Sequence, residues 1–403
     1  MVDVLAAPQQ RKADSALRTL TGISIAHWIS HFHLLVLPML FPFLKSQLGV
    51  GYIELGFALT VFAVVSGLTQ APTGYLVDHF GARKILLGGL VLGGLSLVLL
   101  GLYLSYSSLI VCAVLLGLAN SVYHPADYAI LSEHMDEARM GRAFSIHTFA
   151  GFLGGAVAPA IVAALVTTTG GGGALIVSGI IGVLIALLLL AMNIPDAGAH
   201  KKKPGGAQLA KQGIITPALI MLTLLFMLLG LSNAGISNFG VVALMGGYDA
   251  SYASANVALT AYLAASAIGV LAGGLLADRT ERHGQLAAAC FAVNAAVVLV
   301  IATVALPGWL LTAAMTAAGF LGGVIAPSRD MLVRNAVPAG AAGRAFGIVS
   351  TGFNFSGIIS PLLFGWVMDH NAPHWVFGAS VVFMLATVAL SLFTERREPD
   401  ATT

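Results

Sequence analysis

The sequence predicts an all-α membrane protein with twelve transmembrane helices in two pseudo-symmetric six-helix lobes. Three observations support this prediction: the composition, the spacing of the apolar segments and an internal repeat. Of the 403 residues, 58% are hydrophobic and 9% are charged, whereas a soluble domain carries about 25% charged residues. A soluble protein this apolar could not cover its surface with polar side chains, so we expect the chain to lie in a lipid bilayer.

Twelve segments are long and apolar enough to cross the hydrocarbon core, which needs about 20 apolar residues per helix. They cover residues 19–44, 51–76, 84–104, 107–132, 143–168, 172–193, 215–243, 250–277, 285–306, 308–334, 343–369 and 373–394. The first segment is too long for the core of a signal peptide and lacks a convincing cleavage site, so we expect it to be retained as a spanning helix.

The second half of the chain repeats the first at an offset of about 200 residues. Gly-Tyr-Leu-Val-Asp at 74–78 recurs as Gly-Leu-Leu-Ala-Asp at 274–278, and Gly-Arg-Ala-Phe at 141–144 recurs unchanged at 343–346. Two helix-disrupting prolines recur at an offset of 202 residues, Pro125 and Pro159 matching Pro327 and Pro361. A repeat of this length in so apolar a chain is typical of a two-lobed membrane transporter, with the transport path between the lobes.

Basic residues predict the orientation. With both termini in the cytoplasm, all but Lys45 and Arg329 of the 19 Lys and Arg residues lie at cytoplasmic helix ends or loops. Cytoplasmic loops carry an excess of these residues, so we expect a multi-pass protein of the bacterial inner membrane with both termini cytoplasmic. The expected parts are a tail over 1–18, a first lobe over 19–193, a linker over 194–214, a second lobe over 215–394 and a tail over 395–403. The Lys201–Lys203 run of the linker is expected to be solvated, with contact to anionic membrane lipid as the alternative.

Several classes of function are excluded by composition and motifs. A net charge of +2 is too small to indicate a nucleic acid as partner. The two cysteines lie in apolar runs, which favours buried helix positions over a disulfide framework or a zinc site. The nucleotide-binding pattern G-x-x-x-x-G-K-[ST] does not occur, so drive by ATP would require a separate subunit. We expect a monomer without a resident cofactor and without enzymatic activity.

Residues 74–84, Gly-Tyr-Leu-Val-Asp-His-Phe-Gly-Ala-Arg-Lys, closely resemble the loop motif G-x-L-x-D-R-x-G-R-K of the major facilitator superfamily. A degraded second copy over 274–284 extends the resemblance to essentially the whole chain and implies that family's fold. Gly74 is expected to permit a close helix contact. In the family, the motif carboxylate, here Asp78, latches the lobes on the cytoplasmic side; the alternative is a solvated turn whose charges set topology. The residues expected in the motif and in gating are Gly74, Asp78, Gly81, Arg83, Arg142, Gly274, Asp278, Arg282, Asp330 and Arg344.

Within the superfamily, the chain is most similar to the fosmidomycin-resistance group of efflux proteins. Residues 26–31, Ala-His-Trp-Ile-Ser-His, look like that group's first-helix S-H-x-x-N-D, and residues 120–125, Asn-Ser-Val-Tyr-His-Pro, look like its S-S-x-F-H-P. Two positions depart from the pattern. The first-helix aspartate of the group is His31 here, and the glutamate after His-Pro is Ala126, with Asp127 one residue later.

Ionisable residues at membrane depth are costly and usually mark a pathway or a proton site. In this chain they are His27, His31 and His33 in span one, His124 and Asp127 in span four, His147 in span five, and Arg329 and Asp330 in span ten. His27 and His31 share a helix face. We expect the pair to line the central cavity and to bind a substrate anion or carry a proton, with hydrogen bonding between packed helices as the alternative. His33 is expected to have an interfacial or structural role, whereas His147 fits either a functional or a structural role.

Asp127 and Arg329 correspond in the repeat, because each lies two residues after a paired proline. We hypothesise that they pair across the cytoplasmic gate when the transporter faces outward. Alternatively, Asp127 titrates as the coupling proton site while Arg329 meets an anionic substrate, or Arg329 pairs with a local acid such as Asp330. Neutral polar residues, among them Asn120, Tyr123 and Asn354, are expected to complete the substrate site.

The expected function is secondary active transport of a small organic solute across the inner membrane by alternating access. We expect coupling to protons and favour efflux, with the solute, protons and membrane lipid as partners. The alternative is a transporter of a metal ion or metal chelate with His27, His31, His124 and Asp127 as ligands, since imidazole and carboxylate suit first-row metals. An intramembrane enzyme is the remaining alternative, but a symmetric repeat suits rocking lobes better than a fixed catalytic site.

Overall fold

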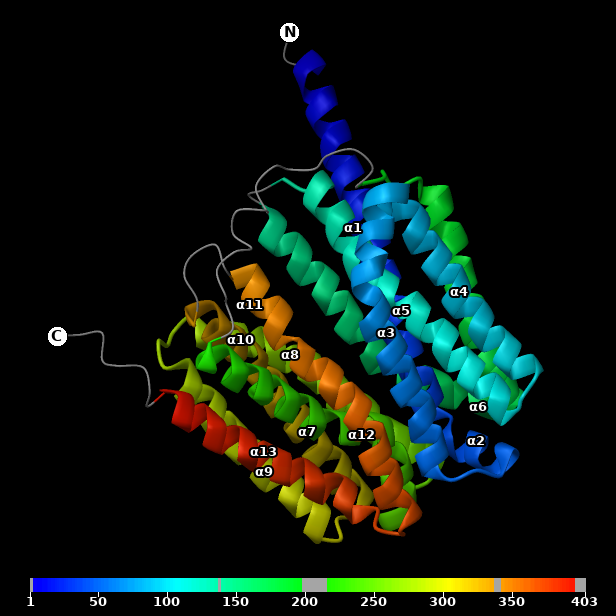
Figure 1. Cartoon of the computed structure of the whole chain (residues 1–403), viewed down its shortest axis with the longest axis vertical. Coiled ribbons are helices and arrows are strands. Elements are labelled where there is room, and N and C mark those ends of the chain that lie inside the picture. The colour runs from blue at the N-terminus through cyan, green and yellow to red at the C-terminus, as the bar shows by residue number, and fades with distance from the viewer. Residues whose placement is uncertain (1–2, 137–138, 198–215, 337–341, 396–403) are drawn as a thin grey trace, which may run out of the picture. The chain divides into compact units, whose positions relative to one another are not determined.

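The computed structural model describes residues 3–136, 139–197, 216–336 and 342–395, and helices joined by short connections make up this part of the chain (Figure 1). The helices are α1 (Asp3–Met39), α2 (Phe41–Leu48), α3 (Tyr52–Phe80), α4 (Ala82–Leu102), α5 (Tyr106–His134), α6 (Met140–Met192), α7 (Pro217–Gly247), α8 (Tyr252–Ala277), α9 (His283–Thr303), α10 (Gly308–Asn335), α11 (Ala342–Val349), α12 (Thr351–Asp369) and α13 (His374–Glu395). The described residues contain no strand, so the predicted all-α class is confirmed.

The predicted number of spans agrees with the helices once α6 is divided. Within the described chain, 11 helices are long and apolar enough to cross a membrane. One of them, α6, has 53 residues and is interrupted at Gly170, whose φ of 74° and ψ of 173° are not helical. Glycine tolerates this backbone because it has no Cβ. The break falls between the predicted spans 143–168 and 172–193, so α6 supplies both.

The predicted end of the first span, at residue 44, is wrong. Helix α1 ends at Met39, and the separate helix α2 begins at Phe41. Pro42 has no amide hydrogen to donate to the carbonyl four residues earlier, which interrupts the helical ladder, and proline is well tolerated at the start of a new helix. The predicted span 343–369 is likewise divided, into α11 and α12 on either side of Ser350.

The described chain forms two compact units. Unit 1 contains residues up to 40 and residues 61–197, and unit 2 contains residues 41–60 and those from 216 onward. The boundary between the units thus falls within helix α3: its residues up to Thr60 belong to unit 2, and the rest belong to unit 1. In unit 1, α6 packs on α1 and α4, and α4 also packs on α5. In unit 2, α8 packs on α10, and α7 and α9 pack on α13.

Small residues let these helices approach closely. A Cβ added to Gly179 of α6 would collide with the backbone carbonyl oxygen of Gly94 on α4. A Cβ added to Gly319 of α10 would collide in the same way with the carbonyl oxygen of Tyr262 on α8. Within a bilayer, helix association depends on such close van der Waals packing, because lipid tails are as apolar as the helix surfaces.

Candidate functional site

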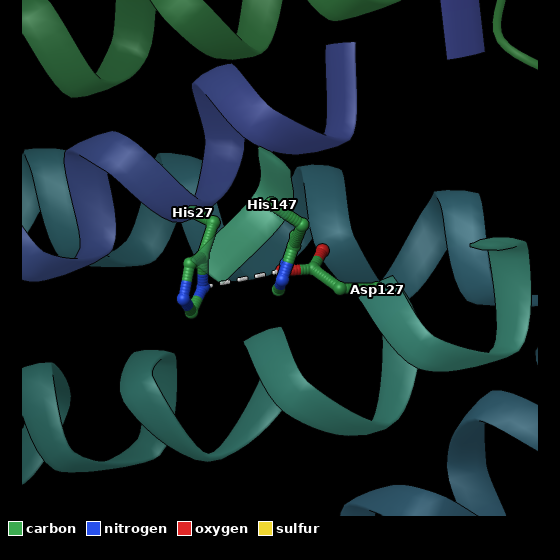
Figure 2. Close-up of side chains that lie close together, drawn as sticks. All are labelled: His27, Asp127 and His147. Atoms are coloured by element: carbon green, nitrogen blue, oxygen red, sulfur yellow. Dashed lines mark hydrogen bonds and ion pairs between the residues drawn. The ribbon is translucent and has the colours of Figure 1, made fainter. Parts of the chain in front are cut away.

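Three ionisable side chains of unit 1 meet around one carboxylate. Asp127 of α5 is completely buried. Its Oδ2 lies 3.0 Å from Nε2 of His147 on α6 and 3.6 Å from Nδ1 of His27 on α1 (Figure 2). Oδ2 and Nε2 of His147 are within hydrogen-bonding distance, and this nitrogen is the donor whenever the carboxylate is ionised. We call these residues the His27–Asp127–His147 cluster.

Helix α6 provides the space in which the cluster lies. A Cβ added to Gly151 would come within 2.5 Å of Cδ2 of His27 and within 3.0 Å of Cδ2 of His31. A Cβ added to Gly154 would collide with the backbone carbonyl oxygen of Trp28 on α1. Glycine at both positions thus brings the α6 backbone against α1 and leaves room for the imidazole rings.

Further aromatic rings surround the cluster. The rings of His27 and His147 stack with centroids 3.9 Å apart and planes inclined by 22°. The His31 ring makes an edge contact with His27 at 4.7 Å, and the His124 ring lies 5.4 Å from His27. Tyr128 lies beside His124 and His147, at 5.6 and 5.9 Å. Four imidazoles therefore lie near one buried carboxylate, and the two outer ones, His31 and His124, are only half-buried.

Several polar atoms of this region are buried without a hydrogen-bond partner among the described residues. They include Oδ1 of Asp127, Nδ1 of His27, His124 and His147, and the hydroxyl of Tyr123. A buried polar group left unpaired costs about 1–3 kcal/mol. Natural proteins leave few such groups, and each calls for an explanation, for example a catalytic role or a bound ion. The unpaired atoms of this region all lie on residues in or beside the cluster.

The other predicted polar residues of unit 1 lie close by. His33 is buried, and its Nε2 lies 3.0 Å from the backbone oxygen of Ser178, in agreement with the structural role expected for it. Asn120 donates from Nδ2 to Oγ of Ser66 at 2.8 Å. A cavity of about 10 Å³, lined among others by His33, Asn120 and Tyr123, has room for about one water molecule.

In unit 2, Arg329 pairs with its neighbour. Nε and Nη2 of Arg329 lie 2.9 and 2.8 Å from Oδ1 of Asp330. The guanidinium also lies over the rings of Phe226 and Phe353, at 4.7 and 5.3 Å from their centroids. The local pairing is thus the arrangement in this structure, whereas the gate pair of Asp127 and Arg329 stays a prediction. Asn354 of α12 is exposed.

The loop motif joins the start of α4 to the chain that follows α6. Gly81 has a φ of 94°, and a Cβ there would collide with the carboxylate of Asp196. Oδ1 of that carboxylate accepts from the backbone N–H of Arg83 at 2.9 Å. The Arg83 guanidinium donates to Oδ1 of Asn193 at 2.7 Å and to the carbonyl of Leu190 at 3.1 Å. Asp196 and Asn193 were not predicted, because a single acid after the sixth span carries no motif.

The remaining motif residues lie on open surface. A Cβ added at Gly74 would meet no atom within 4 Å, and the same holds for Gly274, so the close helix contact expected at Gly74 stays a prediction. Its neighbour Tyr75 is exposed. Other motif residues are exposed, namely Asp78, Arg142, Asp278 and Arg282. The side chain of Arg344 in α11 lies outside the described residues. Their gating roles stay predictions.

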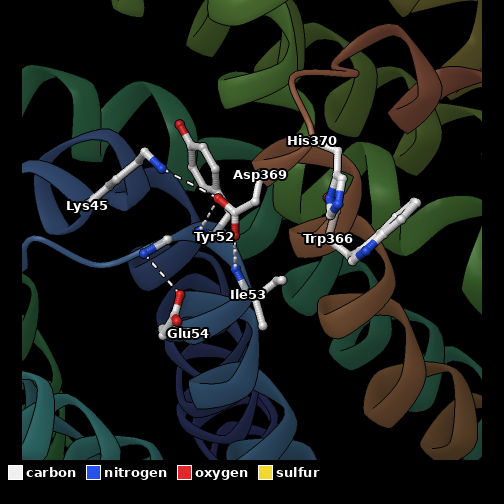
Figure 3. Close-up of polar contacts among 8 residues, drawn as sticks. Lys45, Tyr52, Ile53, Glu54, Trp366, Asp369 and His370 are labelled. Carbon is white, nitrogen blue, oxygen red and sulfur yellow. Dashed lines mark hydrogen bonds and ion pairs between the residues drawn. The ribbon is translucent and has the colours of Figure 1, made fainter.

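A second polar cluster, in unit 2, was not predicted. Asp369 at the end of α12 accepts hydrogen bonds from the backbone N–H groups of Tyr52 and Ile53, both at 2.8 Å (Figure 3). Nζ of Lys45 lies 3.5 Å from Oδ1 of Asp369 and 4.2 Å from the centroid of the Tyr52 ring. A carboxylate at a helix N-terminus satisfies free N–H groups and the helix dipole. An open cavity of about 370 Å³ adjoins this cap, with Lys45, Tyr52 and Asp369 in its wall.

One group in the described chain has the spacing of metal ligands. His27, Asp127 and His147 each offer one ligand atom, and these atoms lie within 4.8 Å of one another. The ligand set predicted for the metal alternative, His27, His31, His124 and Asp127, shares His27 and Asp127 with this group but has His31 and His124 in place of His147. The reason is tertiary: packing of α6 on α1 and α5 brings His147 against the carboxylate, while His31 and His124 stay at the edge.

A family model described as Major Facilitator Superfamily matches residues 23–239 and 222–403. The fosmidomycin resistance protein of Escherichia coli is 25% identical over 284 residues, 69% of each chain. A probable sulfoacetate transporter of Cupriavidus necator is 26% identical over 398 residues, 89% of this chain and 90% of the relative. In fold, the chain is similar to a bacterial homologue of the human lysosomal transporter Spinster, with a TM-score of 0.77, 14% identity and coverage of 95% and 97%.

Proposed function

The chain belongs to the major facilitator superfamily, and we propose that it is a proton-coupled secondary transporter that exports a small organic solute by alternating access. We place it in the bacterial inner membrane with both termini cytoplasmic, as its basic residues favour. Export is supported by the similarity to a fosmidomycin resistance protein. A small organic solute agrees with that relative and with the probable sulfoacetate transporter.

The observation that supports proton coupling is the buried Asp127 carboxylate beside two buried imidazoles. Burial of a charge is costly unless it is paired, so the charge of this cluster affects the stability of any conformation that encloses it. Adding or removing one proton changes that charge by one unit. If the conformations hydrate the cluster differently, each proton bound or released shifts their populations, which is the requirement for coupling.

Within the cluster, the residues have distinct proposed roles. Asp127 provides the fixed acceptor, and Nε2 of His147, at 3.0 Å, holds the proton that the carboxylate shares. His27, whose Nδ1 is 3.6 Å from the same oxygen, is the second carrier. The half-buried His31 and His124, whose rings lie next to that of His27, pass protons between the cluster and the less buried part of unit 1.

Transport in proteoliposomes tests the proposal. An internal pH dye follows proton flux after addition of fosmidomycin or sulfoacetate, the two solutes that the relatives suggest. We expect solute-dependent proton flux in the wild type, with the sign of antiport. Asp127→Asn and His147→Gln should lose the flux while retaining solute binding. His33→Gln serves as the matched control, because it removes a buried histidine outside the cluster. Proton flux that persists in Asp127→Asn would refute the role of the cluster in coupling.

A further inference from the structure

We propose that the His27–Asp127–His147 cluster is a binding site for a divalent first-row transition-metal ion of the Zn²⁺ class. The ligand atoms are Nδ1 of His27, Oδ2 of Asp127 and Nε2 of His147. The ion is a ligand of the transporter distinct from its organic solute. Its binding rests on the geometry of the cluster and does not depend on proton coupling.

The distances fit such an ion. Tetrahedral Zn²⁺ holds nitrogen and oxygen ligands at about 2.0–2.2 Å, which places the ligand atoms about 3.3–3.6 Å from each other. In the cluster, Oδ2 of Asp127 is 3.0 Å from Nε2 of His147 and 3.6 Å from Nδ1 of His27. All three atoms lie within 4.8 Å of one another. Coordination therefore needs side-chain shifts of about 1.5 Å or less. The stacked rings of His27 and His147 must also turn, so that both ligand nitrogens point at the ion.

The donor types also fit. Two imidazole nitrogens and one carboxylate oxygen form the set found at zinc sites that keep a fourth position open. The three ligands come from three different helices, α1, α5 and α6, whose packing holds them together. Only a deprotonated ring nitrogen binds a metal ion, so Nε2 of His147 releases to solvent the hydrogen that it donates to Asp127 when the ion binds.

A second and independent observation concerns unpaired atoms. Asp127 is 0% exposed, yet its Oδ1 has no hydrogen-bond partner among the described residues. Nδ1 of the buried His27 also lacks one and faces the carboxylate. An ion bound between these groups coordinates Nδ1 of His27 directly. It also neutralises the negative charge of the Asp127 carboxylate, which is delocalised over Oδ1 and Oδ2. The buried carboxylate is then stabilised by a full positive charge at coordination distance.

Two less buried imidazoles border the site. The ligands themselves are buried, whereas His31 and His124 are half-buried and lie with ring centroids 4.7 and 5.4 Å from that of His27. An ion that enters from the side of His31 and His124 meets these imidazoles before it reaches Asp127. Once bound, it occupies the three atoms at which the proposed transport cycle holds its protons, so it should arrest proton-coupled transport.

Binding of Co²⁺ to the purified full-length protein in detergent tests the site. Four-coordinate Co²⁺ gives strong visible absorption, whereas hydrated octahedral Co²⁺ absorbs weakly. We expect one Co²⁺ per chain with the four-coordinate spectrum, and loss of that spectrum on addition of Zn²⁺. His147→Gln and His27→Gln should each weaken binding at least about 100-fold, since loss of even an outer-shell partner costs 10–100-fold.

Matched variants separate the site from loss of fold. His33→Gln, a buried histidine of the same helix as His27, should bind Co²⁺ as the wild type does. His147→Cys replaces one ligand by another and should restore binding with an added thiolate charge-transfer band. A folded wild type that gives only the spectrum of hydrated Co²⁺, or equal affinity in His147→Gln, overturns the proposal. Neither result bears on solute transport, which the proteoliposome assay measures separately.

Discussion

Replacement of Asp369 by alanine should loosen the first turn of α3. The carboxylate accepts from the N–H groups of Tyr52 and Ile53, both at 2.8 Å. Loss of a side-chain cap costs about 0.5–2 kcal/mol, and loss of negative charge at a helix N-terminus costs about 0.3–1 kcal/mol more. The pair with Lys45 adds little, because its 3.5 Å distance and a lysine side chain that is 41% exposed are typical of surface pairs worth about 0–1 kcal/mol. The sum is about 1–3 kcal/mol.

Amide hydrogen exchange measures this effect where it arises. A change of about 1.4 kcal/mol in local opening raises the exchange rate about tenfold, so Asp369→Ala should accelerate exchange at residues 52 and 53 by about 5–150-fold. Lys45→Ala should accelerate it less than about fivefold. Glu281→Ala, which removes an exposed acid between α8 and α9, should leave it unchanged. Unaltered exchange at these amides in Asp369→Ala would refute the capping role, as would an equal effect of Lys45→Ala.

Three further substitutions test the packing around the sites. Gly151→Ala should lower the stability of the fold by about 1–3 kcal/mol, measured as a lower melting temperature. It should also reduce transport, because the new methyl group meets the rings of His27 and His31. Wild-type transport in this variant would contradict the close packing. Gly81→Ala should destabilise unit 1 by about 1–3 kcal/mol, because its φ is 94° and the methyl group meets Asp196; Gly74→Ala, which meets no atom within 4 Å, is the control, and equal melting temperatures for the two would refute the argument. Asp196→Ala should increase proteolysis after α6, since the carboxylate accepts from the N–H of Arg83; an unchanged digestion pattern would count against that anchor.

Helix content and span positions could be predicted because each depends on local properties. A span needs about 20 apolar residues whatever it packs against, and the structure has apolar helices at all the predicted positions. Breaks inside a span were harder to predict. Gly170 lies between two predicted spans and is the point where α6 is interrupted. The break after Met39 could not be predicted from hydropathy, because the sequence stays apolar from α1 into α2. That break depends on Pro42, which has no amide hydrogen to donate.

The candidate site was predicted in part. The polar residues His27 and Asp127 stood out because charge is rare at membrane depth, and both lie in the cluster. His147 fitted a structural and a functional role equally, since its position near the start of a span says nothing about its neighbours. His147 belongs to the cluster because Gly151 and Gly154 have no side chains, which lets the α6 backbone approach α1 closely.

By itself, the sequence determined the family, the all-α class and the set of ionisable residues that the membrane must accommodate, because hydropathy, charge and motif spacing are properties of the chain. Only the tertiary structure decided which of those residues meet. It joined His147, rather than His31 or His124, to Asp127, and it brought Asp369 to the start of α3, 317 positions away from Tyr52. Distances of 3 Å between side chains depend on how backbones pack, and no local pattern encodes them.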